Sequence, residues 1–378
     1  MDGELYIGLM SGTSADGVDG VVARWADGSP PVVLAHEQQP YPDTLRAELL
    51  ALNRPGSDEL HRAARAAHAV ALAYAEVVAT LLRRCGLNAS AVRAIGAHGQ
   101  TVRHRPRPVD AAGYTVQLLA GAVLAECTGI DVICDLRSRD LAAGGQGAPL
   151  VPALHQALFA DEHDDVAVLN IGGIANLSLL PARRSGTAAE VTGFDCGPGN
   201  ALMDAWCEAH TGQRFDDQGR WAAGGRVDGP LLHRLMAEPF LAASPPKSTG
   251  RDLFDRPWLE RQLAAHGAAL PARDVQATLA EFTARAAAEA LLRHAPVTRR
   301  LLVCGGGARN THLMARLGQR LPGVDIAETA IAGVPVDQVE ALAFAWLARA
   351  FVRGEAGNLP SVTGAQGPRR LGALYPGH

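Results

Sequence analysis

The chain has 378 residues, enough for two domains of ordinary size or one large one. Its net charge is −4 and 48% of its residues are hydrophobic, which argues against a nucleic-acid-binding protein. No apolar run reaches about 18 residues, so the sequence predicts no membrane-spanning helix and no membrane partner. The start of the chain lacks a signal-peptide pattern and the six cysteines lack CxxC spacing. We therefore expect a cytoplasmic protein without disulfides or a zinc site.

A strand, a tight turn and a second strand are predicted at the start of the chain, from Leu5 to Val22. The turn, Ser11 to Gly17, consists mainly of small residues, hydroxyls and glycines. Glycine lets backbone N–H groups face one point and hydroxyls add donors, which suits a phosphate group. The turn lacks the lysine of a P-loop, so it is not a Walker A motif. The same residues are also usual in an ordinary hairpin turn.

The rest of the first half alternates helices with strands. Apolar residues at helical spacing predict a helix over residues 59–84. A short buried strand over 93–97 ends in a polar cluster, residues 97–104, and open α/β sheets bind ligands at such strand ends. A helix over 117–127 and a strand over 131–135 follow.

Glycines and prolines between residues 140 and 152 indicate a crossing into a second half, which opens like the first. Residues 166–180 again predict strand, glycine turn and strand. Two such turns facing each other across a cleft could hold one polyphosphate. We expect a first domain of residues 1–140 with the C-terminal tail 355–378, and a second domain of residues 141–354.

Later features of the second half could also carry function. Asp195 ends a short apolar stretch, and Asn200 can cap a helix over 201–210 that Gly212 closes. Residues 216–257 look irregular, as is usual for a functional or surface loop.

The second half ends in a regular pattern. Asp274 can cap a long helix that runs to His294, and a strand over 299–304 leads into three glycines before another helix. Such a turn lets a flat ring or a phosphate lie against backbone. A last helix is predicted over 336–353.

Strands alternating with helices argue for an α/β fold. Two hairpin turns, a late strand–glycine–helix turn and a final helix resemble the sugar kinase, Hsp70 and actin superfamily. That resemblance implies a two-domain actin-like or hexokinase-like ATPase fold with a central nucleotide cleft. Eight segments, weak singly and specific in their joint order, are Gly8–Asp19, His98–Thr101, Asp135–Arg137, Gly144–Pro152, Asn170–Asn176, Phe194–Asn200, Lys247–Arg251 and Leu359–Ala365.

These segments, nearly end to end, make the chain similar to the anhydro-N-acetylmuramic acid kinases. The resemblance implies that ATP phosphorylates the 6-oxygen of 1,6-anhydro-N-acetylmuramic acid while water opens the anhydro bridge at carbon 1. The product is N-acetylmuramic acid 6-phosphate, in the reuse of cell-wall fragments. ATP, Mg²⁺ and a homodimer are implied with it. Cys196, where many relatives have threonine, is a small departure that we do not expect to abolish activity.

Asp195 is predicted to be the general base that takes a proton from the attacking water. The bridging oxygen leaves carbon 1 and goes to phosphorus, so the phosphoryl group replaces the proton that an acid would supply. One base is then enough, unlike the two carboxylates of a glycosidase. Judged from the residues alone, an aspartate at this place is more often a helix cap or a turn residue.

The other predicted site residues form two sets. Those expected along ATP are Ser11, Gly12, Thr13, Ser14, Ala15, Asp16, Gly17, Val18, Asp19, Asn170, Gly172, Gly173, Gly305, Gly306, Gly307 and Asn310. Those expected at the sugar are His98, Gln100, Thr101, Gly197, Asn200 and Glu340. Asp16 or Asp19 would act through Mg²⁺ or water, because a carboxylate repels a phosphate. The metal ligands themselves stay open.

Each of these residues also has a structural interpretation. The glycine turns could be plain hairpins or a tight strand-to-helix connection. His98 could be a satisfied core histidine or hold a neighbouring loop, and Glu340 could lie on a helix surface. Lys247, Ser248 and Arg251 could touch the substrate or only order their loop.

Two other functions stay open beside this one. An ordinary sugar kinase of the same fold would phosphorylate a free hydroxyl without ring opening. A non-enzymatic protein could bind nucleotide as a switch. A dinucleotide oxidoreductase is disfavoured, because no G-x-G-x-x-G opens a helix with an acidic residue about 20 positions later.

Overall fold

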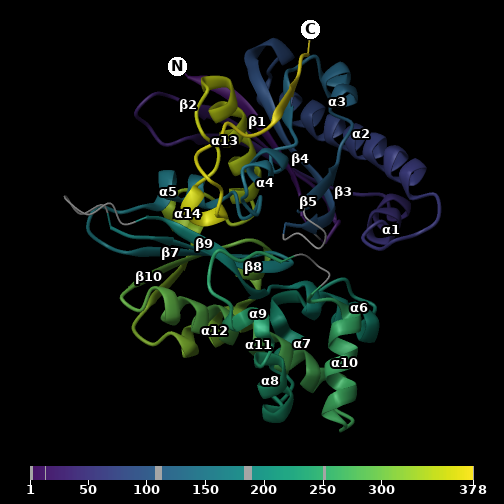
Figure 1. The fold of residues 1–378 in the computed structure, drawn as a ribbon, viewed down its shortest axis with the longest axis vertical. Coiled ribbons are helices and arrows are strands. Elements are labelled where there is room, and N and C mark those ends of the chain that lie inside the picture. Colours follow the sequence, from purple (N-terminus) through teal and green to yellow (C-terminus); the bar gives the residue numbers. More distant parts are fainter. Residues whose placement is uncertain (1–2, 13, 107–112, 183–189, 250–252, 378) are drawn as a thin grey trace. The chain divides into compact units, whose positions relative to one another are not determined.

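A computed structural model describes residues 3–12, 14–106, 113–182, 190–249 and 253–377. Contacts divide the chain into two compact units, residues 1–154 with 338–378 and residues 155–337 (Figure 1). The division between residues 154 and 155 falls inside helix α5 (Pro152–Phe159). The C-terminal part of the chain thus belongs to the first unit.

The first unit contains a mixed sheet, seven-stranded in the described residues, with helices packed on it. Its strands are β1 (Glu4–Ser11), β2 (Gly17–Trp25), β3 (Val32–Pro40), β4 (Val92–Arg105), β5 (Tyr114–Leu118), β6 (Val132–Cys134) and β12 (Ala373–Tyr375). Its helices are α1 (Asp43–Ala51), α2 (Glu59–Cys85), η1 (Ala89–Ala91), α3 (Gly121–Thr128), α4 (Ser138–Ala142), α13 (Val339–Arg353) and α14 (Pro360–Thr363).

The strand order in this sheet is β12-β6-β4-β1-β2-β3, and β5 pairs with β4. The predicted hairpin at the start of the chain is confirmed, because β1 and β2 pair antiparallel from Glu4 opposite Trp25 to Met10 opposite Asp19. β1 also pairs parallel with β4. The tail returns to this sheet, as predicted, since β12 pairs antiparallel with β6.

Opposite faces of the sheet carry α2 and α13, because successive strand side chains alternate between faces. Ile7 and Leu9 belong to the same core cluster as the buried residues of α2. Gly8, between them, faces α13 so closely that a Cβ there would lie 1.9 Å from the Ala341 carbonyl oxygen. Only glycine allows this helix to approach the strand.

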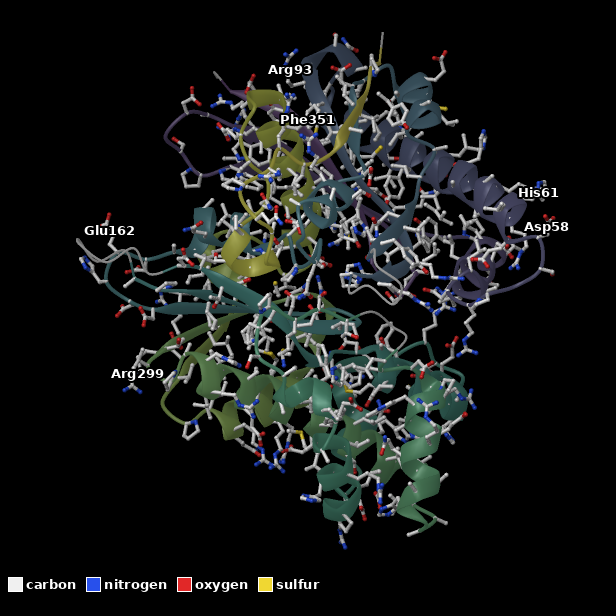
Figure 2. The ribbon with its side chains drawn as sticks, viewed as in Figure 1. Asp58, His61, Arg93, Glu162, Arg299 and Phe351 are labelled. Atoms are coloured by element: carbon white, nitrogen blue, oxygen red, sulfur yellow. The ribbon has the colours of Figure 1, made fainter. Side chains whose placement is uncertain are left out.

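Helix α2 is, within the described residues, long and apolar enough by composition to cross a membrane. Its apolar side is nevertheless built into the first unit's core, where Val70, Tyr74 and Leu81 are fully buried. Asp58 and His61, at its N-terminal end, point outward (Figure 2). Packing in the core therefore accounts for the composition of this helix.

The second unit contains a five-stranded sheet in the described residues, ordered β11-β10-β7-β8-β9. Its strands are β7 (Val166–Ile171), β8 (Ile174–Leu180), β9 (Thr192–Pro198), β10 (Arg300–Cys304) and β11 (Asp325–Glu328). Its helices are α6 (Ala201–Thr211), η2 (Asp217–Gly219), α7 (Arg220–Ala223), α8 (Gly229–Met236), α9 (Pro239–Ala242), α10 (Arg256–His266), α11 (Ala272–His294), η3 (Gly306–Arg309), α12 (Thr311–Arg320) and η4 (Thr329–Ala332).

The two sheets repeat one connectivity. In each, an antiparallel three-stranded meander (β1-β2-β3, β7-β8-β9) is extended from its first strand by parallel strands (β4 and β6, β10 and β11). The predicted α/β fold with a glycine-turned hairpin opening each half is confirmed. The central nucleotide cleft stays a prediction.

Two predicted elements were wrong in extent. Residues 97–104 do not form a loop after a short strand, because β4 continues to Arg105 where β5 pairs with it. Residues 114–118 form that partner strand, so the helix predicted over 117–127 begins only at Gly121. Pairing between β4 and β5 determines where β4 ends and where the helix begins. The spacing of apolar residues within one segment could not predict that pairing.

The irregular stretch predicted over 216–257 contains short helices, η2 and α7 to α9. Asp274 does not cap α11; its Oδ1 accepts the Arg226 N–H at 2.9 Å instead. Contacts also group α13 and residues 141–154 with the first unit, whereas the sequence predicts a second domain over residues 141–354. For α13, the close approach of Gly8 to Ala341 is the physical reason.

Candidate functional site

Buried side chains of the first unit hold the glycine turn that follows β1. Ser11 is fully buried; its Oγ lies 2.7 Å from the Tyr74 hydroxyl and donates to the Gly99 carbonyl at 3.0 Å. Gln100 Nε2 donates to the Gly12 carbonyl at 2.9 Å. Because the Ser11 hydroxyl is bonded to protein groups, Ser11 would meet a phosphate through its backbone and not through its side chain.

His98 supports the same turn. Its Nδ1 lies 3.3 Å from the Ser11 carbonyl oxygen, and its Nε2 lies 3.0 Å from Arg137 Nε. Because a guanidinium can only donate, Nε2 accepts and Nδ1–H donates to Ser11. Burial, and then the Arg137 charge, hold the pKa of His98 well below its usual value, so the ring is neutral. Both ring nitrogens are therefore engaged with protein groups.

Arg137 and Asp140 are residues to which the sequence analysis assigned no role. Arg137 Nη1 also donates to the Gly147 carbonyl at 2.6 Å. The fully buried Asp140 accepts the Gly147 N–H at 2.7 Å and the Thr363 hydroxyl at 2.7 Å. In the sequence, Arg137 stands in the motif segment Asp135–Arg137, and Asp140 lies between that segment and Gly144–Pro152. Those positions were the only indication of a role for either residue. Together they tie the glycine-rich crossing to the first turn and to the tail.

Four predicted sugar residues lie in the first unit: His98, Gln100, Thr101 and Glu340. Helix α13 positions Glu340 at its N-terminal end, and its Phe344 ring lies 4.8 Å from the His98 ring. Within the part of the chain that the structure describes, Gln100 Oε1 is buried without a hydrogen-bond partner, which makes it available to a polar ligand.

Several residues predicted along ATP can contribute only backbone. Ala15 and Val18 are buried in the core cluster. A Cβ at Gly17 would lie 2.2 Å from the Gln39 carbonyl oxygen, so this glycine serves packing against β3. Ser14 is half-buried, and Thr13 lies outside the described residues, as do residues 250–252.

Asp16 and Asp19 flank the first turn and differ in surroundings. The Asp16 side chain is 55% exposed, and its Oδ1 lies 3.5 Å from Arg46 Nε. Asp19 Oδ1 is buried without a hydrogen-bond partner and lies 3.5 Å from His36 Nε2. A carboxylate oxygen that accepts no hydrogen bond from the described residues, beside a possible phosphate turn, fits Mg²⁺, which takes one or two carboxylates together with phosphate oxygens.

In the second unit, backbone contacts hold the corresponding turn between β7 and β8. The N–H groups of Gly199 and Asn200 donate to the Gly173 and Gly172 carbonyls at 3.0 and 2.8 Å. The predicted side-chain cap of α6 by Asn200 is wrong, because its Nδ2 donates to the Ile171 carbonyl at 3.2 Å instead. The structure thus brings Asn200 to the predicted phosphate turn.

The glycines after β10 lie against this turn. A Cβ at Gly305 would be 2.4 Å from Asn170 Oδ1, and one at Gly307 would be 2.3 Å from Ile171 Cγ2. Asn310 caps α12, with Oδ1 accepting the Leu313 N–H at 2.9 Å. Asn170, Gly172, Gly173, Asn200 and Gly305–Gly307 therefore lie together within one unit.

Glycines at the two turns are of two kinds. Gly199, Gly305 and Gly307 are crowded by backbone or side chains. Gly12, Gly172 and Gly306 are open: a Cβ would meet its nearest atom at 3.9, 3.8 and 3.7 Å, respectively. The crowded glycines permit packing, whereas the open ones leave backbone accessible.

Asp195 lies on β9, buried to 6% exposure. Its N–H donates to the Lys247 carbonyl at 3.1 Å, and its Oδ2 accepts the Thr249 N–H at 2.7 Å. Asn170, Asn176 and Asp195 are paired in register across three strands, so their side chains share one face of the sheet. The Asp195 side chain therefore lies on the same face of the sheet as that of Asn170, at the start of the second turn.

Asn176 is a residue of this row that the site prediction missed. Its Oδ1 is buried without a hydrogen-bond partner and stands between Asn170 and Asp195 in the register. The only indication in the sequence was the place of Asn176 in the motif segment Asn170–Asn176.

Gly197, a predicted sugar residue on β9, has a φ of +153°. A Cβ added to it would lie 3.0 Å from the Ala286 Cβ of α11.

Comparison with known proteins settles the family. Residues 4–377 match the family described as anhydro-N-acetylmuramic acid kinase. The chain belongs to this family. It is 61% identical over 376 residues to the anhydro-N-acetylmuramic acid kinase of Variovorax paradoxus, covering 100% of both chains. It is 59% identical to that of Bordetella petrii, covering 99% of this chain and 97% of that one.

A third relative, the anhydro-N-acetylmuramic acid kinase of Cupriavidus metallidurans, is 56% identical and covered to 98%, over 99% of this chain. The family resemblance stated from the motifs is therefore confirmed along the whole chain. The roles of single residues within the family's reaction stay predictions.

Proposed function

We propose that this chain is an ATP-dependent kinase that opens 1,6-anhydro-N-acetylmuramic acid with water and phosphorylates its 6-oxygen. The products are N-acetylmuramic acid 6-phosphate and ADP, and the biological role is peptidoglycan recycling in the cytoplasm. The observation that carries the proposal is the 61% identity, over the full length, to the Variovorax paradoxus enzyme of that name. A homodimer is the expected assembly.

Asp195 is the general base of this mechanism. It takes a proton from water, the water oxygen bonds to carbon 1, and the bond from carbon 1 to the bridging oxygen breaks. That oxygen bonds to the γ-phosphorus and ADP leaves, so no separate acid is needed. The Thr249 N–H on Oδ2 at 2.7 Å fixes the orientation of the carboxylate. Burial of Asp195 keeps bulk water from competing with the reacting molecule.

The open glycines are the groups proposed to meet the nucleotide. Gly12, Gly172 and Gly306 leave space on the side where a Cβ would stand, with no atom nearer than 3.7 Å, so a phosphate or a ribose can approach their backbone. Asp19, and Asp16 beside it, would hold Mg²⁺. When bound, Mg²⁺ neutralises charge on the phosphates.

The sugar contacts are proposed at Gln100, Thr101, Glu340 and Asn200, with His98 acting through the backbone of Ser11. Gln100 supports this role best, because its Oε1 is buried and unpartnered while its Nε2 is bonded to Gly12. Asn176 Oδ1, unpartnered in the row with Asp195, would accept the second O–H of the attacking water.

The test is turnover of ATP and the anhydro sugar in ¹⁸O-labelled water, read by mass spectrometry. We expect phosphate on the 6-oxygen and label at carbon 1. Asp195→Asn should lower kcat on the order of 10²–10⁴-fold, the usual worth of a positioned base. A phosphorylated product without label would favour an ordinary sugar kinase, and tight nucleotide binding without turnover would favour a binding protein.

A further inference from the structure

Lys247 is a buried cation of the second unit, 2% exposed, in the segment that leads away from α9. Its Nζ donates to the Phe240 and Leu241 carbonyls of α9 at 2.9 and 3.1 Å. The same Nζ lies 4.9 Å from the Phe240 ring centroid and 5.7 Å from that of Phe194. The ammonium is therefore engaged with protein groups.

Two backbone groups of the same segment form hydrogen bonds with Asp195. The Lys247 carbonyl accepts the Asp195 N–H at 3.1 Å, and the Thr249 N–H donates to Asp195 Oδ2 at 2.7 Å. The segment thus lies beside β9 at Asp195. Movement of Lys247 would displace the carbonyl that accepts the Asp195 N–H and, two residues on, the Thr249 N–H that donates to the carboxylate.

We propose that Lys247 is a positioning residue, which anchors the Lys247–Thr249 segment to α9 and thereby holds the Asp195 carboxylate in its working orientation. It does not bind the sugar or the nucleotide. The inference rests on the proposed function for the role of Asp195 as base, while the anchoring itself does not depend on that role.

The energetics support an anchor. A buried ammonium is stable only when its protons are bonded, so Lys247 binds the α9 carbonyls or its burial becomes costly. Burial lowers its pKa, as expected for a cation removed from water. Because a displacement of about 1 Å can cost about 10²-fold in rate, loosening this segment should affect catalysis more than binding.

Lys247→Met keeps the length and apolar stem of the side chain and removes its donors. We expect kcat for the anhydro sugar to fall about 100-fold, while KM for the sugar and for ATP stays within about twofold of wild type. Arg293→Met is the matched control. Arg293 Nη1 donates to the same Leu241 carbonyl at 3.2 Å and is exposed, and among the described residues no hydrogen bond joins it to the segment that holds Asp195. It should leave all three constants unchanged.

Hydrogen exchange of the apo protein supplies a readout that needs no activity. Lys247→Met should accelerate exchange in the peptides containing the Asp195 and Thr249 amides, and Arg293→Met should not. An unchanged kcat with unchanged exchange overturns the proposal, and so does a raised KM for the sugar with kcat intact, because Lys247 would then be a substrate ligand. If wild type fails to turn over the sugar, the proposed function fails, while the exchange comparison still decides the anchoring.

A second variant guards against loss of the fold. If Lys247→Met is not folded by circular dichroism and gel filtration, Lys247→Gln takes its place, since its shorter, uncharged side chain cannot keep the bonds to both α9 carbonyls. A folded Lys247→Gln with wild-type kcat and wild-type exchange overturns the proposal. Faster exchange with a lowered kcat supports it.

Discussion

The two glycine turns occupy the same place in their sheets, between the first two strands of a meander, yet they are held by different means. Side chains hold the first: Ser11, His98 and Gln100 bond it to α2 and β4. Backbone bonds dominate in the second: the Gly199 and Asn200 N–H groups bond directly to the Gly173 and Gly172 carbonyls, and the Asn200 side chain adds one bond to the Ile171 carbonyl.

The difference shows which substitutions each turn can tolerate. A turn held by buried polar side chains fails when one partner is removed, because the remaining group is left unpaired. A turn held by close backbone contact fails when a methyl group is added, because no space exists for it. The second turn therefore depends on small residues, and the first on a complete hydrogen-bond network.

Gly199→Ala should have the largest effect on the second turn. Its Cβ would lie 2.1 Å from the Gly172 carbonyl oxygen, so backbone must move. We expect a loss of about 3 kcal/mol of stability, measured by urea unfolding. Gly229→Ala is the control, since nothing lies within 4 Å of a Cβ there, and it should be neutral.

Gly172→Ala extends this test to the ligand. Its Cβ has free space, so stability should be kept, while ATP binding weakens about tenfold by calorimetry because the methyl group occupies the proposed phosphate position. Equal destabilisation by Gly172→Ala and Gly199→Ala would contradict the division into open and crowded glycines.

Arg137→Met should have the next largest effect and should act on the first turn. It leaves His98 Nε2 and the Gly147 carbonyl without their donor, at a cost of about 2 kcal/mol. Hydrogen exchange should accelerate over residues 5–12 and leave residues 166–177 unchanged. Equal acceleration in both peptides would show that the two turns are not separately held.

Acid should loosen the first turn before the second. The pKa of His98 is held well below its usual value of about 6.5, so the folded turn keeps the ring neutral. When the turn opens, His98 regains its usual pKa and takes up a proton below about pH 6.5. Its contribution is therefore full above that pH and falls by up to about 1.4 kcal/mol per pH unit below it.

Hydrogen exchange at pH 7.5 and pH 5.5, corrected for intrinsic rates, checks this difference. Protection over residues 5–12 should fall at the lower pH, and protection over residues 170–175 should fall less, because no histidine takes part in the described contacts of that turn and His155, whose pKa burial lowers to about 3, bonds Ser178 beyond it. An equal loss in both peptides would mean that acid acts on the whole protein.

Local signals in the sequence were sufficient for much of the fold. Glycines between alternating apolar strands predicted both hairpins, and Gly86 and Gly212 end α2 and α6 in the left-handed conformation that glycine favours. The order of eight short motifs indicated the family. These signals hold because turn and cap conformations depend on residues close together in the chain.

Tertiary structure alone decided the other features, because the hydrogen bonds of a polar side chain and the extent of a strand depend on which group from elsewhere in the chain lies beside them. Asn200 has the right type for a helix cap, but the Ile171 carbonyl lies nearer, so its side chain bonds there. The polar residues after Ala97 continue a strand because β5 arrives beside them. Lys247 could have faced a ligand or its own chain, and the carbonyls of α9 settle that it faces its own chain.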